Sequence, residues 1–384
     1  MRIRRSMVLT VLITIITAVL LSSCAGGKDR SKTLVIYNWG EYMSRESDTY
    51  TLYGKDYEIT DVIEDFKAKY PEYDVVYSTY DDNEKMYPMI DKESFDIIIP
   101  SDYMVVRLLK ENKLQKLDMS KLPNVEKYMD QSLASIRFDP DEAISNQVYD
   151  YAAPYMYCTV GLIYNRDELG QLTDTDPAAV WDILFDTSWE NRIGMYNSMR
   201  ESIGASLNYL GYSLNTVAAA ELEEAKNLLI EQRKSVKPIV GIDDLKDKYV
   251  SGELVAGIAW SGDHVVCQQK LQDGGQDPEM LQYILPQGSN MSIDMMCIPE
   301  NAENVEAAHA FIDFMYEPEI ALKNAVYVGY SSPHTEVKQQ LPIEITSNTS
   351  YYPDAETMES LELYFSSEEI DTTYDKIWQT VLAN

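Results

Sequence analysis

The first third of this chain alternates short apolar runs with segments of helical period, and this alternation constrains its fold more than any other feature. Residues 34–37 and 74–80 have the composition of strands, and residues 59–70 carry apolar side chains at helical spacing until Pro71. Residues 43–58 show no period and are predicted to form a loop. Strands that alternate with helices favour an α/β fold with a mostly parallel sheet.

Two of the predicted strands end in aromatic and polar residues. Residues 34–37 lead into the sequence WGEY at 39–42, and the strand 95–99 leads through Pro100 into SDY at 101–103. Open α/β sheets bind ligands beyond the carboxyl ends of their strands. These two strand ends are therefore the first candidates for a binding site.

The later part of the chain continues the pattern and is long enough for a second domain. About 360 residues follow position 23, which favours two domains over one core. Further strands are predicted at 155–164, 193–196, 254–260 and 293–299, and a charged helix is predicted at 217–232.

The amino end reads as a secretory signal followed by a lipid-attachment site. A basic start precedes an apolar run of about 15 residues, which ends in Leu21-Ser22-Ser23-Cys24. A cysteine at this boundary resembles a bacterial lipobox. We predict a signal peptide at 1–23, lipid on Cys24 and a polar tether over 24–32. The alternative is a transmembrane anchor, but the run is shorter than the roughly 20 residues that a span needs.

Charge and cysteine usage exclude several classes of partner. The formal charge of −31 is the wrong sign for nucleic acid, which we exclude, and it would attract cations. Solubility alone is the other explanation of this charge. Apart from Cys24, the cysteines are Cys158, Cys267 and Cys297, without metal-ligand spacing, so no metal or cofactor is predicted. They form either three thiols or one disulfide and one thiol.

Carboxylates and aromatic rings gather in the predicted turns and strand ends. An organic cation needs both, because carboxylates accept ammonium hydrogens and ring faces cover methylenes and charge. The candidates from the residues alone are Trp39, Glu41, Tyr42, Ser101, Tyr103, Glu201, Trp260, Asp263, Asp294 and Tyr330.

Each candidate has a plainer explanation. Trp39 and Trp260 end apolar strands and could equally belong to the core, as could any tyrosine in a chain with 29 of them. Asp294 lies inside an apolar run, where an acid needs a partner, and this favours a functional role. Glu201 and Asp294 could instead form the acid/base pair of a hydrolase, although no nucleophile or metalloprotease motif accompanies them.

Five segments, in order, resemble the spermidine/putrescine-binding proteins of bacterial ABC importers. They are VIYNWGEY at 35–42, YSTY at 77–80, FDIIIPSDY at 95–103, LGYS at 210–213 and YPDAET at 352–357. The resemblance implies a two-lobed periplasmic-binding-protein fold of type II, with crossover strands and a ligand cleft between the lobes. We assign 33–141 and 294–338 to lobe 1, and 142–293 and 339–384 to lobe 2.

The resemblance also implies which positions contact the ligand. Carried over one by one, they are Trp39, Gly40, Glu41, Tyr42, Ser101, Tyr103, Ser198, Glu201, Trp260, Asp294 and Tyr330.

Four positions depart from the spermidine-binding type. Gly40 stands where that type has Thr, Ser198 where it has an acid, Ser292 where it has Trp, and Tyr364 where it has Gln. A third ammonium would have one carboxylate fewer, so putrescine is expected to compete well with spermidine. Tyr196 and Asp263 are the candidates to compensate. The choice of polyamine stays open.

The sequence therefore predicts a membrane-tethered extracytoplasmic receptor that delivers a polyamine to an ABC permease, without catalysis. Two alternatives remain. One is a secreted carboxylate-dependent hydrolase, and the other is a sensor of the same fold for another organic cation.

Overall fold

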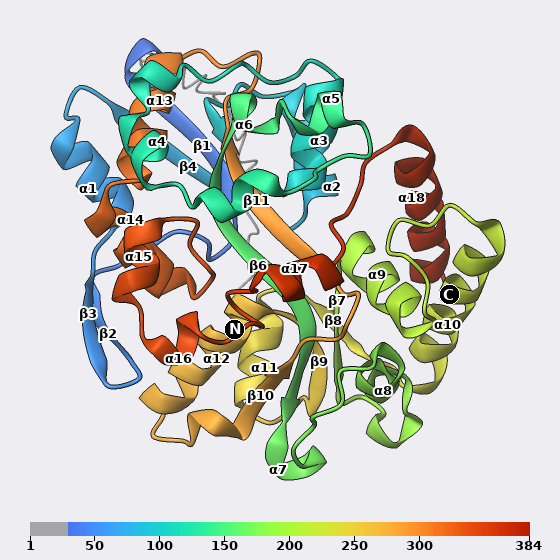
Figure 1. The fold of residues 1–384 in the computed structure, drawn as a ribbon. Helices are drawn as coiled ribbons and strands as arrows, with labels where there is room; N and C mark the ends of the chain where they lie inside the picture. The colour runs from blue at the N-terminus through green and yellow to red at the C-terminus, as the bar shows by residue number, and fades with distance from the viewer. Residues whose placement is uncertain (1–29) are drawn as a thin grey trace, which may run out of the picture.

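The computed structural model describes residues 30–384, so the predicted signal peptide and Cys24 lie outside the described residues. Two α/β lobes share one mixed sheet, which has nine strands in this part of the chain (Figure 1). The strand order is β4-β1-β5-β11-β6-β9-β7-β8, and β10 pairs with β6. The predicted α/β, two-lobed class is confirmed.

The first lobe is built on parallel strands, as the alternating pattern predicted. Its strands are β1 (Thr33–Trp39), β4 (Asp74–Tyr80) and β5 (Ile97–Ile98). Its first helices are α1 (Val62–Lys69), α2 (Asn83–Ile90) and α3 (Asp102–Lys110). Asp61 caps α1 by accepting hydrogen bonds from two backbone N–H groups of its first turn, and α1 ends at Lys69, just ahead of Pro71.

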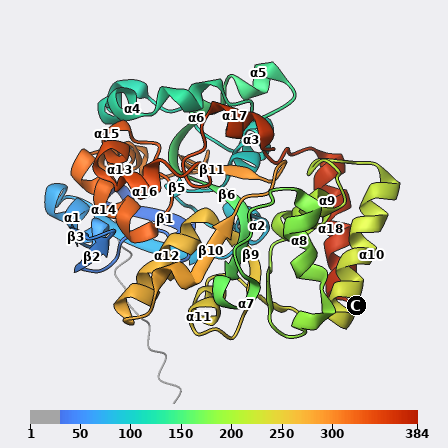
Figure 2. The same ribbon diagram turned by 60° about the horizontal axis from the view of Figure 1, so that its bottom comes forward.

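The second lobe repeats this arrangement. Its parallel strands are β7 (Ile193–Tyr196), β8 (Ile239–Gly241) and β9 (Ala256–Trp260). The helices around them are α9 (Met199–Tyr209), α10 (Ala219–Ser235), α11 (Asp244–Val250), α12 (Ser261–Asp273) and α18 (Glu368–Leu382). Figure 2 shows α9, α10 and α18 at the opposite end of the molecule from α1, α13 and α14.

Shorter helices and the return segments complete both lobes. They are α4 (Pro123–Tyr128), α5 (Glu142–Ser145), α6 (Val148–Tyr151), α7 (Arg166–Leu169), α8 (Pro177–Trp181), α13 (Val305–Met315), α14 (Pro318–Val328), α15 (Thr335–Gln340), α16 (Ile343–Thr346) and α17 (Ala355–Ser360).

One long strand joins the lobes, and its antiparallel neighbours correct the prediction of a mostly parallel sheet. β6 (Ala152–Asn165) is buried along its whole length and pairs antiparallel with β11 (Met291–Cys297), with β9 and with β10 (Leu281–Ile284). β6 contacts β11 through its first half and β9 through its second half, so it passes from one lobe into the other. A continuous apolar run indicates that a strand is buried, but not whether its neighbours run parallel or antiparallel to it. The alternation of strands and helices therefore predicted the wrong strand direction here.

The loop predicted over 43–58 is wrong for most of its length. β2 (Asp48–Leu52) and β3 (Lys55–Ile59) form a hairpin whose two-residue turn is Tyr53-Gly54. Both turn residues have positive φ, 49° and 77°, as a type I′ turn requires. Tyr-Gly lacks the Asn or Asp that usually signals this turn, so the sequence does not predict the hairpin.

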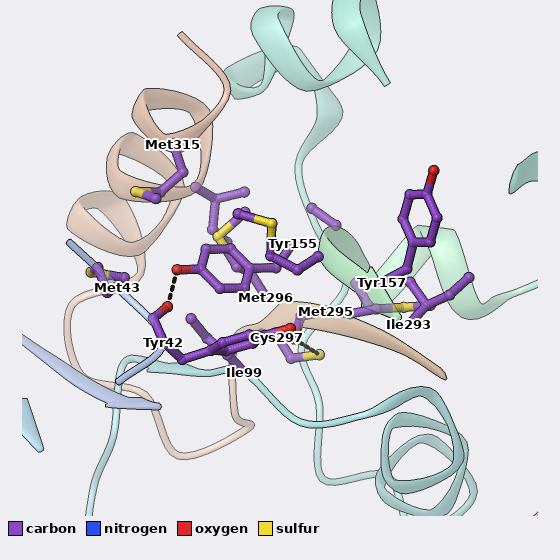
Figure 3. Close-up of a cluster of buried hydrophobic side chains, with 14 of the residues drawn as sticks. Tyr42, Met43, Ile99, Tyr155, Tyr157, Ile293, Met295, Met296, Cys297 and Met315 are labelled. Carbon is purple, nitrogen blue, oxygen red and sulfur yellow. Dashed lines mark hydrogen bonds between the residues drawn. The ribbon is translucent and has the colours of Figure 1, made fainter. Parts of the chain in front are cut away.

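Among residues 30–384, the buried hydrophobic side chains form two clusters, each centred on the strands of one lobe. The first cluster extends through β1, β5, β11 and the start of β6, and the second surrounds β7, β9 and the end of β6. Figure 3 shows part of the first cluster, where the hydroxyl of Tyr155 points at the backbone carbonyl of Tyr42 and donates a hydrogen bond of 2.5 Å. The lobe boundaries at 141/142, 293/294 and 338/339 stay a prediction.

The cysteine alternatives are resolved in this structure. Cys158, Cys267 and Cys297 are buried free thiols. Over residues 30–384, no helix has the length and apolar character needed to cross a membrane.

Candidate functional site

A cavity of about 250 Å³ lies between the two lobes, beyond the ends of β1 and β9. All the predicted ligand-contacting positions line it: Trp39, Gly40, Glu41, Tyr42, Ser101, Tyr103, Ser198, Glu201, Trp260, Asp294 and Tyr330. Ser292 and Asp263 line it as well. The fold therefore gathers these residues from both halves of the chain, and their contact with a ligand stays a prediction.

Asp294 is a buried carboxylate held by two hydroxyl groups of the first lobe. It lies on β11, where a register shift between Asp294 and Met295 interrupts the pairing with β6. Tyr42 donates to Oδ2 at 2.6 Å, and Ser101 donates to Oδ1 at 2.7 Å. Burial raises the pKa of Asp294 to about 6, although both hydrogen bonds act in the opposite direction.

Glu201 is a second buried carboxylate, in the first turn of α9. Its Oε1 accepts from the indole N–H of Trp260 at 3.3 Å, and its Oε2 accepts from the hydroxyl of Tyr364 at 3.0 Å. Burial raises the pKa of Glu201 to about 7. The two hydrogen bonds lower this pKa, but by less than burial raises it. Tyr364, which the resemblance aligned with a Gln, thus supports the carboxylate.

Asp294 and Glu201 have no protein cation of their own. Within residues 30–384 neither side chain forms an ion pair with lysine, arginine or histidine. A buried carboxylate without a counter-ion is costly, and a bound cation would remove that cost.

Aromatic rings from both lobes form the walls beside these carboxylates. Trp39 donates its indole N–H to the carbonyl of Ile99 at 2.9 Å, which fixes the orientation of its ring. The Trp39 and Trp260 ring centroids lie 6.2 Å apart in an edge-to-face arrangement, and Tyr196 stacks on Trp260 at 4.2 Å. The Trp39 and Trp260 rings, which line the cavity, offer faces and edges to an alkyl chain or to a cation.

Tyr103 and Ser198 differ from each other in the hydrogen bonds that their hydroxyl groups make. The Tyr103 hydroxyl donates to Oε1 of Glu84 at 2.9 Å, and the guanidinium of Arg200 lies over the Tyr103 ring at 4.8 Å. Burial, and then the nearby charge of Asp82, raise the pKa of Glu84. Ser198 precedes α9 and makes no capping hydrogen bond through its side chain, so its hydroxyl lies on the cavity wall without a capping role.

A group of charges at the other side of the cavity includes a buried lysine that sequence reasoning missed. Nζ of Lys246, on α11, lies 2.7 Å from Asp243, 3.0 Å from Glu41 and 3.6 Å from Asp263. Tyr330 donates to Asp263 at 3.0 Å. Glu41 has a φ of 47° and extends toward the lysine with half of its side chain exposed.

Lys246 and Asp243 lie in the stretch IDDLKDKYV, which looks like an ordinary solvated helix face. The sequence gives only a weak indication that Lys246 is buried. It follows Leu245 directly and precedes Tyr249 by three positions, and both of these residues are buried. Glu84 and Arg200 were missed for the same reason, because charged residues on helices are usually solvated.

A two-lobed α/β protein that encloses a small, acidic, aromatic-lined cavity between its lobes has the architecture of a solute-binding protein. Residues 61–353 match the family model of the bacterial extracellular solute-binding proteins, and the chain belongs to that family. The family predicted from the sequence is thereby confirmed.

Relatives of known name cover nearly the whole chain. The spermidine/putrescine-binding periplasmic protein of Salmonella typhimurium is 29% identical over 373 residues, which are 95% of this chain and 96% of that protein. The putrescine-binding periplasmic protein SpuD of Pseudomonas aeruginosa is 27% identical over 358 residues, 91% of each chain.

Solved structures agree with the fold. A protein described as a putative spermidine/putrescine ABC transporter from Listeria monocytogenes is 35% identical and superposes with a TM-score of 0.77, covering 92% of this chain and 99% of that one. The spermidine/putrescine transporter substrate-binding protein PotD of Streptococcus pneumoniae is 32% identical with a TM-score of 0.68, at the same coverage.

Proposed function

We propose that this protein is an extracytoplasmic receptor that binds a polyamine between its lobes and delivers it to an ABC permease. The observation that carries the proposal is the pair Asp294 and Glu201, two buried carboxylates that lie beside two tryptophans and form no ion pair with any residue of 30–384. A small alkyl diamine supplies what this cavity lacks, because its ammonium groups pair with carboxylates and its methylenes pack on rings.

The roles of the cavity residues follow from their chemistry. Asp294 and Glu201 accept ammonium hydrogens, and Tyr42 and Ser101 hold Asp294 in place for that contact. Trp39 and Trp260 cover the methylenes, and a cation over an indole face adds roughly 0.5–2 kcal/mol. Relatives named for spermidine and putrescine support this ligand class.

The site of action follows from the amino end of the sequence. Processing at Cys24 would leave a lipid-anchored receptor on the outer face of the cell membrane or in the periplasmic space. Cys24→Ala should move the protein from the membrane fraction to the soluble extracytoplasmic fraction and abolish incorporation of labelled fatty acid. A Cys24→Ala protein that still carries labelled lipid would contradict the anchor.

Calorimetric titration of the purified protein with putrescine, spermidine and spermine tests the receptor function. Saturable binding of one of them, with no product formed, is the expected result. Turnover of a glycoside that is lost in Glu201→Gln would favour the hydrolase instead. Absence of binding to all three polyamines, together with binding of another organic cation, would favour the sensor.

A further inference from the structure

Lys246 places a buried cation among the acidic residues of the cavity, whose lining also includes the cations Arg200 and Lys270. Only 6% of the Lys246 side chain is exposed, and its Nζ contacts carboxylates of Asp243, Glu41 and Asp263. Burying an ammonium is unfavourable unless it is paired, and here three carboxylates compensate it. These carboxylates in turn raise the pKa of Lys246 against the effect of burial, so that it stays charged.

The surroundings of Lys246 come from both lobes. Glu41 follows β1 in the first lobe, and Asp243 and Asp263 belong to the second. Gly40 makes the approach possible, because a Cβ at that position would lie 2.7 Å from Oδ2 of Asp243. A residue with a side chain at position 40 would therefore press on the carboxylate nearest to the lysine.

A lysine side chain is an alkylammonium, the same chemical group as one arm of a polyamine. We propose that Lys246 is a specificity-determining residue: it occupies a cation subsite at the Asp263 side of the cavity and makes the cleft favour a diamine over a triamine. This inference rests on the proposed function, and it concerns which polyamine the site takes.

The hydrogen bonds of Asp263 support this assignment. Its Oδ2 accepts from Tyr196 at 2.5 Å, and its Oδ1 accepts from Tyr330 at 3.0 Å and lies 3.6 Å from Lys246. Asp263 is therefore already satisfied, and it cannot pair with another ammonium unless it shares or loses Lys246. Asp263, a candidate to compensate for Ser198, is thus engaged by the protein itself.

Among the predicted ligand-contacting residues, the carboxylates that Lys246 does not engage match two charges. Within residues 30–384, the hydrogen bonds to Asp294 and Glu201 come only from neutral donors, and each carboxylate can pair with one ammonium. A third ammonium at the Asp263 side of the cavity would approach Lys246, and two like charges in a buried site repel each other strongly. Glu41 and Asp243 are partly exposed, so water screens what remains of their charge.

A purely structural role for Lys246 makes a different prediction. If the Glu41–Lys246 ion pair only holds the lobes together, its loss weakens every ligand to the same degree. The ratio of two affinities measured on one protein separates the roles, because closure of the lobes cancels from that ratio.

The test compares Lys246→Ala with Lys248→Ala by calorimetry. Lys248 lies on the same helix, but it pairs with Glu253 at 3.1 Å and is partly exposed, so it provides the same change of charge and residue type away from Asp263. The ratio of spermidine affinity to putrescine affinity should rise on the order of tenfold in Lys246→Ala, because space and carboxylates become free for a third ammonium. It should stay at the wild-type value in Lys248→Ala.

An equal change for both ligands in Lys246→Ala would overturn the proposal. If that variant does not fold, Lys246→Met removes the charge at similar volume and should still raise the ratio, whereas Lys246→Arg keeps a cation and should leave it low. A folded Lys246→Met protein with the wild-type ratio would also overturn it. A wild-type protein that binds no polyamine would instead refute the proposed function, so the two failures are distinguishable.

Discussion

The hydroxyl of Tyr42 donates a 2.6 Å hydrogen bond to Asp294, a residue 252 positions further along the chain. Tyr42 follows the first strand of lobe 1, and Asp294 lies on the strand that returns from lobe 2. The Tyr42 ring also packs edge-to-face on Tyr330, at 5.0 Å between centroids, and Tyr330 donates to Asp263. Two tyrosines therefore connect Asp294, which forms no ion pair within residues 30–384, with Asp263, which lies beside Lys246.

Asp294→Asn should weaken polyamine binding by about 2 kcal/mol or more, or roughly thirtyfold, because one ammonium loses its counter-ion. Asparagine keeps the size of the side chain and can still accept a hydrogen bond from Ser101. Calorimetric titration measures the loss. Asp277→Asn, which removes an exposed carboxylate paired with Arg166, is the control and should bind as the wild type does. An unchanged affinity in Asp294→Asn would remove this residue from the site.

Trp39→Ala should weaken putrescine binding by roughly 1–2 kcal/mol, since the ligand loses a ring face. Because Trp39 and Trp260 flank the cavity, putrescine should also change the tryptophan fluorescence of the wild type, and this change should shrink in the variant. Trp189→Ala is the control, because its ring lies beside Arg192, away from the cavity. A folded Trp39→Ala protein with wild-type affinity would show that Trp39 serves packing alone.

The cavity residues that the sequence alone predicts lie largely at the ends of strands. Trp39, Glu41, Tyr42, Ser101 and Tyr103 lie where β1 and β5 end, and chain order alone indicates that such ends meet at one edge of a sheet. For the positions across the cleft, the resemblance to a family supplied the alignment that local patterns do not contain.

What the sequence could not supply depends on long-range packing. Lys246 is buried because α11 places it against Asp263 and Glu41, and neither contact is visible in the charged run around it. The antiparallel direction of β6 depends on pairing with β11, more than a hundred residues later. The β2–β3 hairpin depends on a Tyr-Gly turn that composition does not mark.

Polyamine affinity should fall as the pH falls from about 7.5 to 5.5. Burial raises the pKa of Glu201 to about 7 and that of Asp294 to about 6, so both carboxylates take up protons in this range. Only the ionised forms pair with ammonium, whose own pKa of about 10 keeps it charged throughout. Binding near pH 6.5 should therefore release protons.

Titrations in two buffers of different ionisation enthalpy measure that release. Glu201→Gln should release fewer protons than the wild type, because the group with the higher pKa is gone. Equal apparent enthalpies in both buffers for the wild type would show that neither carboxylate changes its protonation on binding.

The raised pKa of Asp294 also predicts how the ligand-free protein responds to pH. Its folded-state value of about 6 lies above the usual 3.8, so the folded state holds the proton more tightly than the unfolded state. The carboxylate therefore costs stability increasingly as the pH rises through this interval, and the full cost is reached above about pH 6. This rise in the pKa corresponds to a loss of about 3 kcal/mol at most in the free energy of unfolding.

Asp294→Asn, which has no proton to lose, should accordingly unfold at higher urea concentration than the wild type at pH 8, with a gain of roughly 1–3 kcal/mol. The gain should shrink toward zero near pH 4, where the wild-type side chain is protonated in the folded state. Asp277→Asn should show no such gain. A variant that is less stable than the wild type at pH 8 would mean that its hydrogen bonds to Tyr42 and Ser101 outweigh the cost of the buried charge. Asp294→Asn is thus expected to stabilise the ligand-free protein against unfolding and to weaken its polyamine binding. Both effects arise because the charge that pairs with the ligand is the charge that the fold buries at a cost in stability.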